Sequence, residues 1–233
     1  MKIYAHRGAS GDYQDNTLLS FEMAIAQGAD GIELDVFEAD GELYIFHDRF
    51  LDKLGLPGVL TENALREQIS SLRVDGEHPV PTLQGALEKI AGRCTVNIEL
   101  KGIRNFTLLV DAVSEALNSF NFVEEQFLVS AFDHPMLIQA KMLLPALDYA
   151  FLTASIPMSF DTFEQHAITS WHVDVNVLTK DAVARAHLQG IAVRAYTVDR
   201  EYDLVTLQSW GVDGVFTNFP KRSRAILAKH VKN

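Results

Sequence analysis

The sequence predicts a protein of the α/β class in which parallel strands alternate with helices. Short apolar runs recur along the 233 residues, and segments with apolar residues three to four positions apart follow most of them. No glycine-rich phosphate loop of the Rossmann or P-loop type follows any candidate strand. We therefore expect a closed (β/α)8 barrel of the TIM type, and the main competitor is a doubly wound open sheet.

The number of candidate strands fits a closed barrel. They begin near Ile3, Asp30, Thr95, Phe127, Leu147, His172, Ala192 and Gly214. Helix-start signals support two of the intervening helices. Asn16 and Thr17 precede one apolar series of helical period, and Asp133 with Pro135 opens another.

The stretch from 37 to 81 is too long for an ordinary connection between a strand and a helix. It contains a strand-like piece, Leu43–Phe46, and then the turn residues Gly55, Pro57 and Gly58. We predict a small insertion after the second strand, placed over the mouth of the barrel. Because the chain contains no internal repeat or flexible linker, residues 1–233 are expected to form one domain.

Composition limits the kinds of partner. A net charge of -11 argues against nucleic acid as the main partner and against anionic membranes, so a phosphate-ester substrate needs local cations. The chain has neither an apolar run close to membrane-spanning length nor a signal region at its start, which predicts a cytoplasmic protein without stable membrane insertion. Its single cysteine, Cys94, excludes an intrachain disulfide. The sequence does not indicate an oligomeric state.

Three acidic residues occupy similar positions on two candidate strands. Side chains alternate faces along a strand, so Glu33 and Asp35 share the face opposite the neighbouring apolar residues, and Glu99 and Lys101 do the same further on. Barrel active sites lie at the C-terminal ends of the strands, where these acids would meet. Three oxygen ligands suit one divalent cation, Mg²⁺ or Ca²⁺. The alternative is that the acids are surface charges or ion-pair partners of Lys101 and Arg194.

Two histidines stand at candidate strand ends. His6 closes the first strand and is followed by Arg7, whose guanidinium suits a phosphate. His47 follows the strand-like piece and precedes Asp48, which can orient its imidazole. The two histidines are a candidate acid–base pair. No role is assigned to the other six histidines, His78, His134, His166, His172, His187 and His230.

An ordered set of short motifs spans nearly the whole chain. It comprises His6–Gly8, Asn16–Thr17, Ser20–Phe21, Gly28–Val36, His47–Asp48, Pro81–Leu83, Glu99–Lys101, Ser130–Asp133, Thr197–Val198 and Gly211–Val215. Taken together, these motifs resemble the glycerophosphodiester phosphodiesterase family.

The resemblance implies a (β/α)8 barrel with a small inserted subdomain. It also implies a divalent cation held by Glu33, Asp35 and Glu99 and catalytic roles for His6 and His47. Arg7 and Lys101 would lie beside the substrate phosphate. The implied reaction releases glycerol 3-phosphate and an alcohol such as choline or ethanolamine from a small glycerophosphodiester.

The chain departs from the family pattern at three positions. Asp15 stands where the family usually has glutamate, Tyr196 where it often has tryptophan, and Asn218 where an aspartate is common. We expect Tyr196 to contact the substrate, and all three departures bear on head-group preference. Two alternatives remain: a barrel acting on a lysophospholipid or sphingolipid head group, as related barrel phospholipases D do, and a non-catalytic barrel that binds phosphate esters.

Overall fold

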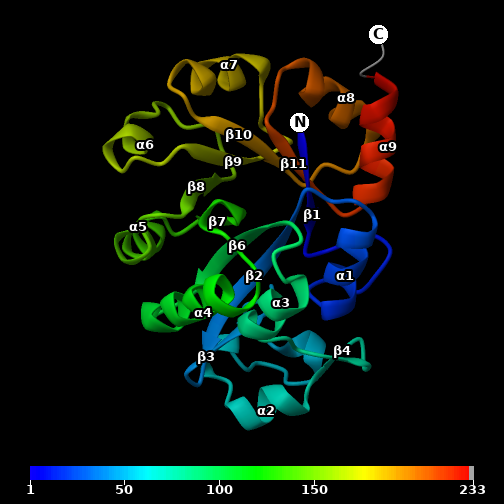
Figure 1. Ribbon diagram of the computed structural model, residues 1–233, viewed down its shortest axis with the longest axis vertical. Coiled ribbons are helices and arrows are strands. Elements are labelled where there is room, and N and C mark those ends of the chain that lie inside the picture. Colours follow the sequence, from blue (N-terminus) through cyan, green and yellow to red (C-terminus); the bar gives the residue numbers. More distant parts are fainter. Residues whose placement is uncertain (231–233) are drawn as a thin grey trace.

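A ring of eight parallel strands forms the centre of the molecule (Figure 1). The computed structural model describes residues 1–230, so the last three residues of the expected domain lie outside it. Adjacent strands of the ring pair in parallel, and β1 closes it by pairing with both β11 and β2. The ring consists of β1 (Lys2–His6), β2 (Gly31–Ala39), β6 (Thr95–Gly102), β7 (Phe127–Ala131), β8 (Asp148–Thr153), β9 (Ser170–Asp174), β10 (Ala192–Tyr196) and β11 (Gly214–Thr217). The predicted closed barrel is confirmed, and the open sheet is excluded.

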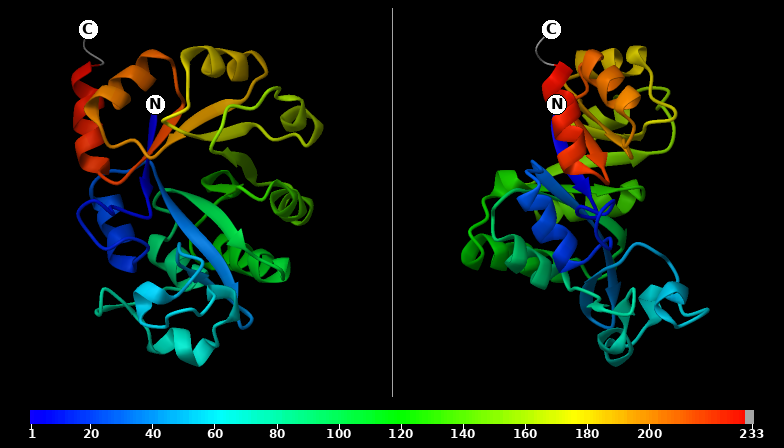
Figure 2. Two further views of the ribbon diagram at one scale, coloured as in Figure 1. Left: turned by 180° about the vertical axis from the view of Figure 1, so that it is seen from behind. Right: turned by 90° about the vertical axis from the view of Figure 1, so that its right-hand side faces the viewer.

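Helices cover the outside of the ring (Figure 2). They are α1 (Leu18–Ala26), α3 (Leu83–Ile90), α4 (Phe106–Ser119), α5 (His134–Leu143), α6 (Asp161–Gln165), α7 (Lys180–Leu188), α8 (Glu201–Ser209) and α9 (Pro220–His230). Both predicted helix starts are confirmed. The Thr17 side chain caps α1 by accepting from the Ser20 amide, and Asp133 caps α5. None of the helices within residues 1–230 is both long enough and apolar enough to span a bilayer.

The side-chain alternation along β2 and β6 takes the predicted form. The apolar members Ile32, Leu34 and Val36 of β2 are completely buried in the main core, as are Val96 and Ile98 of β6. Burying an aliphatic side chain of this size contributes about 1.5–3 kcal/mol relative to leaving it exposed. This packing fixes the orientation of both strands and so turns their acidic residues to the other face.

The insertion lies mainly beyond β2, at one end of the molecule (Figures 1 and 2). Of its described residues, only His47 lines the barrel's pocket. β2 continues to Ala39 because β3 pairs with it in antiparallel fashion outside the ring. The elements of the insertion are β3 (Glu42–Ile45), α2 (Arg66–Ser71), β4 (Arg73–Val74), β5 (His78–Pro79) and the 3-10 turns Asp52–Leu54 and Thr61–Asn63. A separate apolar cluster that includes Phe46, Leu51 and Ile69 stabilises this segment.

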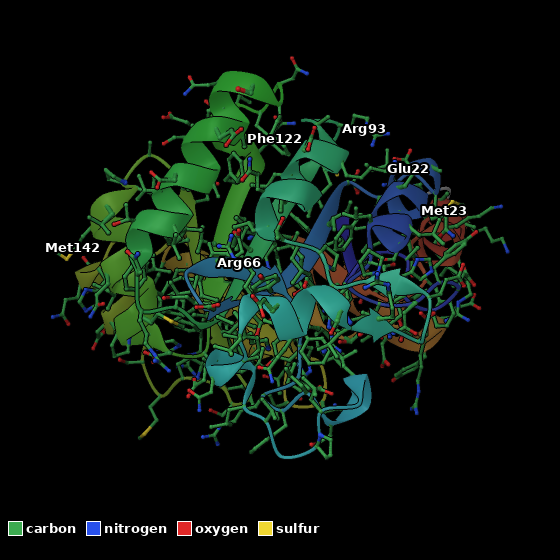
Figure 3. All side chains as sticks on the ribbon, turned by 90° about the horizontal axis from the view of Figure 1, so that it is seen from below. Glu22, Met23, Arg66, Arg93, Phe122 and Met142 are labelled. Carbon is green, nitrogen blue, oxygen red and sulfur yellow. The ribbon has the colours of Figure 1, made fainter. Side chains whose placement is uncertain are left out.

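From below, α2 with Arg66 lies in front of α3 and α4 (Figure 3). In the same view Glu22 of α1 and Arg93, just after α3, lie together. The two terminal guanidinium nitrogens of Arg93, Nη1 and Nη2, donate to the Glu22 carboxylate at 2.9 and 2.8 Å. This ion pair links two neighbouring helices of the barrel wall, and hydrogen bonds from Arg93 lower the pKa of Glu22 to about 2.

Candidate active site

A pocket of about 440 Å³ opens where the C-terminal ends of the barrel strands converge. Seven of the eight predicted site residues line it: His6, Arg7, Glu33, His47, Glu99, Lys101 and Tyr196. The eighth, Asp35, is only 1% exposed and lies behind Arg7 and Lys101, which it contacts. The structure therefore brings together residues that are up to 190 positions apart in the chain.

The three predicted metal ligands form one buried cluster. Glu33, Asp35 and Glu99 each offer an oxygen, and these oxygens all lie within 4.8 Å of one another. The Arg7 backbone N–H donates to Glu33 Oε2 at 2.8 Å, while Glu33 Oε1 is buried with no hydrogen-bond partner among the described residues. A buried carboxylate oxygen without a partner, beside two further carboxylates, fits a hard divalent cation.

The charges of this cluster do not balance within the protein. Burial, with the charges of Asp35 and Glu99, raises the pKa of Glu33 well above its usual value, and burial with Asp35 raises the pKa of Glu99 to about 7. Burial also disfavours ionised Asp35, but Lys101 and Arg7 outweigh it, so the pKa of Asp35 falls. Neutralising such a cluster is what a bound cation does.

Arg7 and Lys101 are held beside the pocket by acids. Arg7 Nε lies 3.1 Å from Asp35 Oδ2, and its Nη1 lies 3.3 Å from an Asp15 carboxylate oxygen. Lys101 Nζ lies 3.1 Å from Asp35 Oδ1 and also contacts Glu99. The ion pairs with Lys101 that the sequence left open are therefore present, whereas Arg194 contacts the Ser170 hydroxyl.

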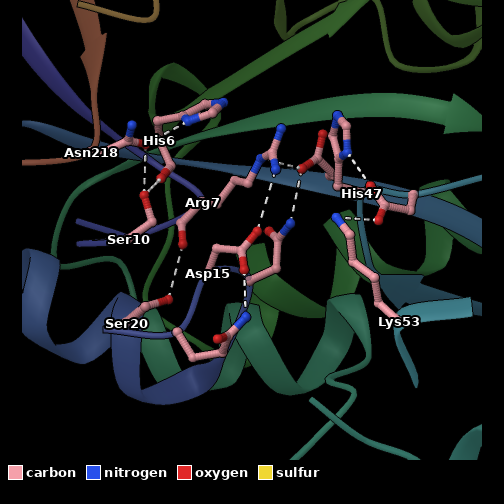
Figure 4. Close-up of polar contacts among 12 residues, drawn as sticks. His6, Arg7, Ser10, Asp15, Ser20, His47, Lys53 and Asn218 are labelled. Carbon is pink, nitrogen blue, oxygen red and sulfur yellow. Dashed lines mark hydrogen bonds and ion pairs between the residues drawn. The ribbon is translucent and has the colours of Figure 1, made fainter. Parts of the chain in front are cut away.

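His6 is fixed by a neutral amide (Figure 4). Its Nδ1 lies 2.8 Å from Asn218 Oδ1, and the Asn218 side-chain amide donates to Asp199 at 2.6 Å. That second bond sets the amide orientation, so His6 Nδ1 carries the hydrogen and Nε2 is the free ring nitrogen. Burial, and then Arg7, lower the pKa of His6 despite the Asn218 hydrogen bond. The neutral ring can accept a proton at Nε2.

His47 is fixed by a carboxylate (Figure 4). Its Nδ1 lies 2.8 Å from one oxygen of Asp48, and Lys53 Nζ lies 2.6 Å from the other. The sequence predicted this orienting role of Asp48. The two histidines therefore both use Nδ1 for support, which leaves Nε2 of each ring for proton exchange.

Several residues of the site were not predicted. Asn16 donates to Asp35 at 2.9 Å, and Asn218 supports His6. His172, to which the sequence assigned no role, lines the pocket while completely buried, and neither ring nitrogen has a hydrogen-bond partner among the described residues. The polar alternation of Ser170, His172 and Asp174 along β9 was the signal that could have found it.

Comparison with known proteins agrees with this fold and pocket. Residues 6–222 match the model of the glycerophosphoryl diester phosphodiesterase family. The chain is 34% identical over 239 residues to an uncharacterized Bacillus subtilis protein, YqiK, covering 97% of this chain and 98% of that one. It is 33% identical over 238 residues to a glycerophosphodiester phosphodiesterase of Bacillus altitudinis, covering 95% and 96%.

A solved structure gives the same result. A phosphodiesterase of Oleispira antarctica, in complex with the product sn-glycerol-3-phosphate, superposes with a TM-score of 0.88 at 26% identity, over 98% of this chain and 97% of that one. The fold and site define a hydrolase barrel with a buried acidic cluster. The chain belongs to the glycerophosphodiester phosphodiesterase family.

Proposed function

We propose that the protein hydrolyses small glycerophosphodiesters to glycerol 3-phosphate and an alcohol, with a divalent cation and a two-histidine acid–base pair. The observation that carries this proposal is the placement of His6 and His47 in the same pocket as the buried carboxylate cluster. The product bound by the Oleispira antarctica relative supports the substrate class.

Glu33, Asp35 and Glu99 would hold one cation, Mg²⁺ or Ca²⁺, since carboxylate oxygens are the preferred ligands of both. When bound, the cation would supply positive charge beside the phosphate and the glycerol hydroxyl of the substrate. The unpartnered Glu33 Oε1 and the raised pKa of Glu33 support this assignment.

Arg7 and Lys101 bind the phosphate oxygens in this proposal. Asp35 already orders both of these side chains, so little reorganisation is needed when the substrate arrives. Their positive charge lies where negative charge develops on the phosphoryl group during the reaction. Tyr196 lines the same pocket at the end of β10 and would contact the substrate beyond the phosphate.

The histidine pair moves the protons. One histidine takes the proton of the glycerol hydroxyl next to the phosphoester, and that oxygen attacks phosphorus as the bond to the alcohol breaks. The other histidine gives its proton to the departing alcohol oxygen. Attack from within the same molecule has the advantage of proximity. Water then opens the resulting cyclic phosphate to glycerol 3-phosphate.

Two further expectations stay predictions. One is that residues 1–233 form a single domain with 37–81 as its insertion. The other is that the protein acts in the cytoplasm.

The test is release of glycerol 3-phosphate from glycerophosphocholine and glycerophosphoethanolamine. His6→Ala and His47→Ala are each expected to lower kcat by about 100-fold or more, since each removes one proton-transfer group. His230→Ala, at the exposed end of α9, is the matched control and keeps wild-type activity. Wild-type turnover by either pocket variant would overturn the assigned pair. A diester without a free hydroxyl next to the phosphoester should react slowly, and equal turnover of that compound would eliminate internal attack.

A further inference from the structure

The pocket has two halves of different character. The half built from β1, β2 and β6 contains the carboxylate cluster, His6, Arg7 and Lys101. The other half is lined by residues at the C-terminal ends of β7 to β10, among them Phe132, Leu152, Asp174 and Tyr196. The proposed reaction requires the phosphate and the attacking glycerol hydroxyl to lie beside the carboxylate cluster and the histidines. With the glycerol in the first half, the departing alcohol occupies the second.

Two aromatic rings form the wall of the second half. Phe132, directly after β7, and Tyr196, at the end of β10, have ring centroids 6.0 Å apart and nearly perpendicular planes, at 85°. The Tyr196 hydroxyl donates to the Thr153 carbonyl at 2.9 Å, which fixes the ring. Lys101 Nζ lies 5.9 Å from the Phe132 ring centroid, so this wall begins beside the phosphate-binding cation.

One carboxylate faces the same space. Asp174 is the register partner of Tyr196 across β9 and β10, and it is the only charged residue among the described residues that line this half. Its Oδ1 accepts hydrogen bonds from the Asn176 backbone and side-chain amides, both at 2.8 Å. These neutral donors orient Asp174 without cancelling its charge.

We propose that this half of the pocket is an alcohol subsite that selects a cationic head group, with Asp174 as the charge-selecting residue. Aromatic rings and a nearby carboxylate together attract the positive charge of an ammonium group, and a neutral alcohol of the same shape lacks this attraction and keeps only its apolar contacts. The inference rests on the proposed function, because it deepens the substrate choice of that same site.

The experiment changes only the charge of the alcohol. Glycerophosphocholine is compared with the 3,3-dimethylbutyl ester of glycerol 3-phosphate, in which a neutral carbon replaces the ammonium nitrogen. The wild-type kcat/KM is expected to be about ten-fold higher for the choline ester, mainly through KM, which corresponds to about 1.4 kcal/mol. Asp174→Asn, which keeps shape and the Oδ1 acceptor, should reduce the preference to about two-fold.

A matched control and a second variant accompany this test. Asp148→Asn removes the same charge from an exposed residue at the start of β8, away from the pocket mouth, and keeps the full preference. Phe132→Leu, at a residue 49% exposed, removes one aromatic face without opening the core and should also weaken the preference. Equal wild-type turnover of the two esters, or an undiminished preference in Asp174→Asn, would overturn the subsite.

Binding separates the subsite from catalysis. Phosphocholine and 3,3-dimethylbutyl phosphate are titrated calorimetrically into the wild type and Asp174→Asn. If the wild type binds phosphocholine more tightly than the neutral compound and Asp174→Asn abolishes that difference, the subsite is supported, even when no diester is hydrolysed. The absence of hydrolysis would then overturn the proposed function alone. Turnover of both esters without any charge preference would overturn the subsite and leave the proposed function standing.

Discussion

We expect the acidic cluster to make the folded protein less stable when no cation is bound, and Glu99→Gln tests this. Burial and Asp35 raise the pKa of Glu99 to about 7, from an ordinary 4.5. Folded protein therefore binds this proton more tightly than unfolded protein does. The contribution of this proton to the free energy of unfolding is fully present below pH 4.5 and is lost as the pH rises through about 7.

The size of the effect follows from that shift. A change from 4.5 to about 7 corresponds to about 3 kcal/mol of free energy disfavouring ionised Glu99 in the fold. Glutamine has the same shape without the charge, and Lys101 keeps Asp35 as its partner at 3.1 Å. Metal-free Glu99→Gln is therefore expected to be more stable than metal-free wild type at pH about 8.5 by up to about 3 kcal/mol. At pH about 5 the two proteins should differ little.

Thermal unfolding in chelator, at both pH values, measures the difference. For a chain of this length about 3 kcal/mol corresponds to a midpoint change of about 6 to 12 °C. Adding Mg²⁺ or Ca²⁺ should raise the wild-type midpoint and raise that of the variant much less, because a ligand charge is gone. Glu88→Gln, at an exposed residue of α3, should behave as wild type. A variant no more stable than wild type at high pH, with an intact metal response, would refute the reasoning.

Three other predictions concern the surroundings of the pocket. Asn218→Ala should lower kcat about 10- to 100-fold, because it releases His6 Nδ1 from its hydrogen-bond partner. An unchanged kcat would show that this support is dispensable. Gly8→Ala should lower the free energy of unfolding by about 1–3 kcal/mol or more, because Gly8 has φ of +83° and a Cβ would lie 2.3 Å from Ser20 Oγ. An unchanged midpoint of unfolding in denaturant would contradict this. Burial raises the pKa of the Cys94 thiol to about 12, so a disulfide reagent should react with Cys94 fast only after denaturation. Fast reaction in the native protein would contradict the burial of Cys94.

Much of the barrel could be predicted because its signals are local. Side chains alternate with period two in any strand, so the apolar and acidic sets of β2 separate onto two faces before any partner is known. The convergence of parallel strand ends then brings Glu33, Asp35 and Glu99 together. The caps at Thr17 and Asp133 are equally local.

The parts that the sequence did not predict depend on distant contacts. Asn218 reaches His6 across 212 positions, and Asn16 reaches Asp35 only because the loop between β1 and α1 returns to β2. β9 begins at Ser170, two positions before the predicted His172, so the inward face of that strand and its buried imidazole were missed. The extension of β2 to Ala39 follows from its pairing with β3, which no local pattern in β2 shows.

The most direct test of the central claim is glycerol 3-phosphate release by protein stripped of metal and then titrated with Mg²⁺ or Ca²⁺. We expect no turnover of glycerophosphocholine in chelator, recovery that saturates with one of the two cations, and loss of that recovery in Glu33→Gln. Full activity in chelator from protein shown to be metal-free would contradict the assignment of the buried carboxylate cluster as the catalytic cation site.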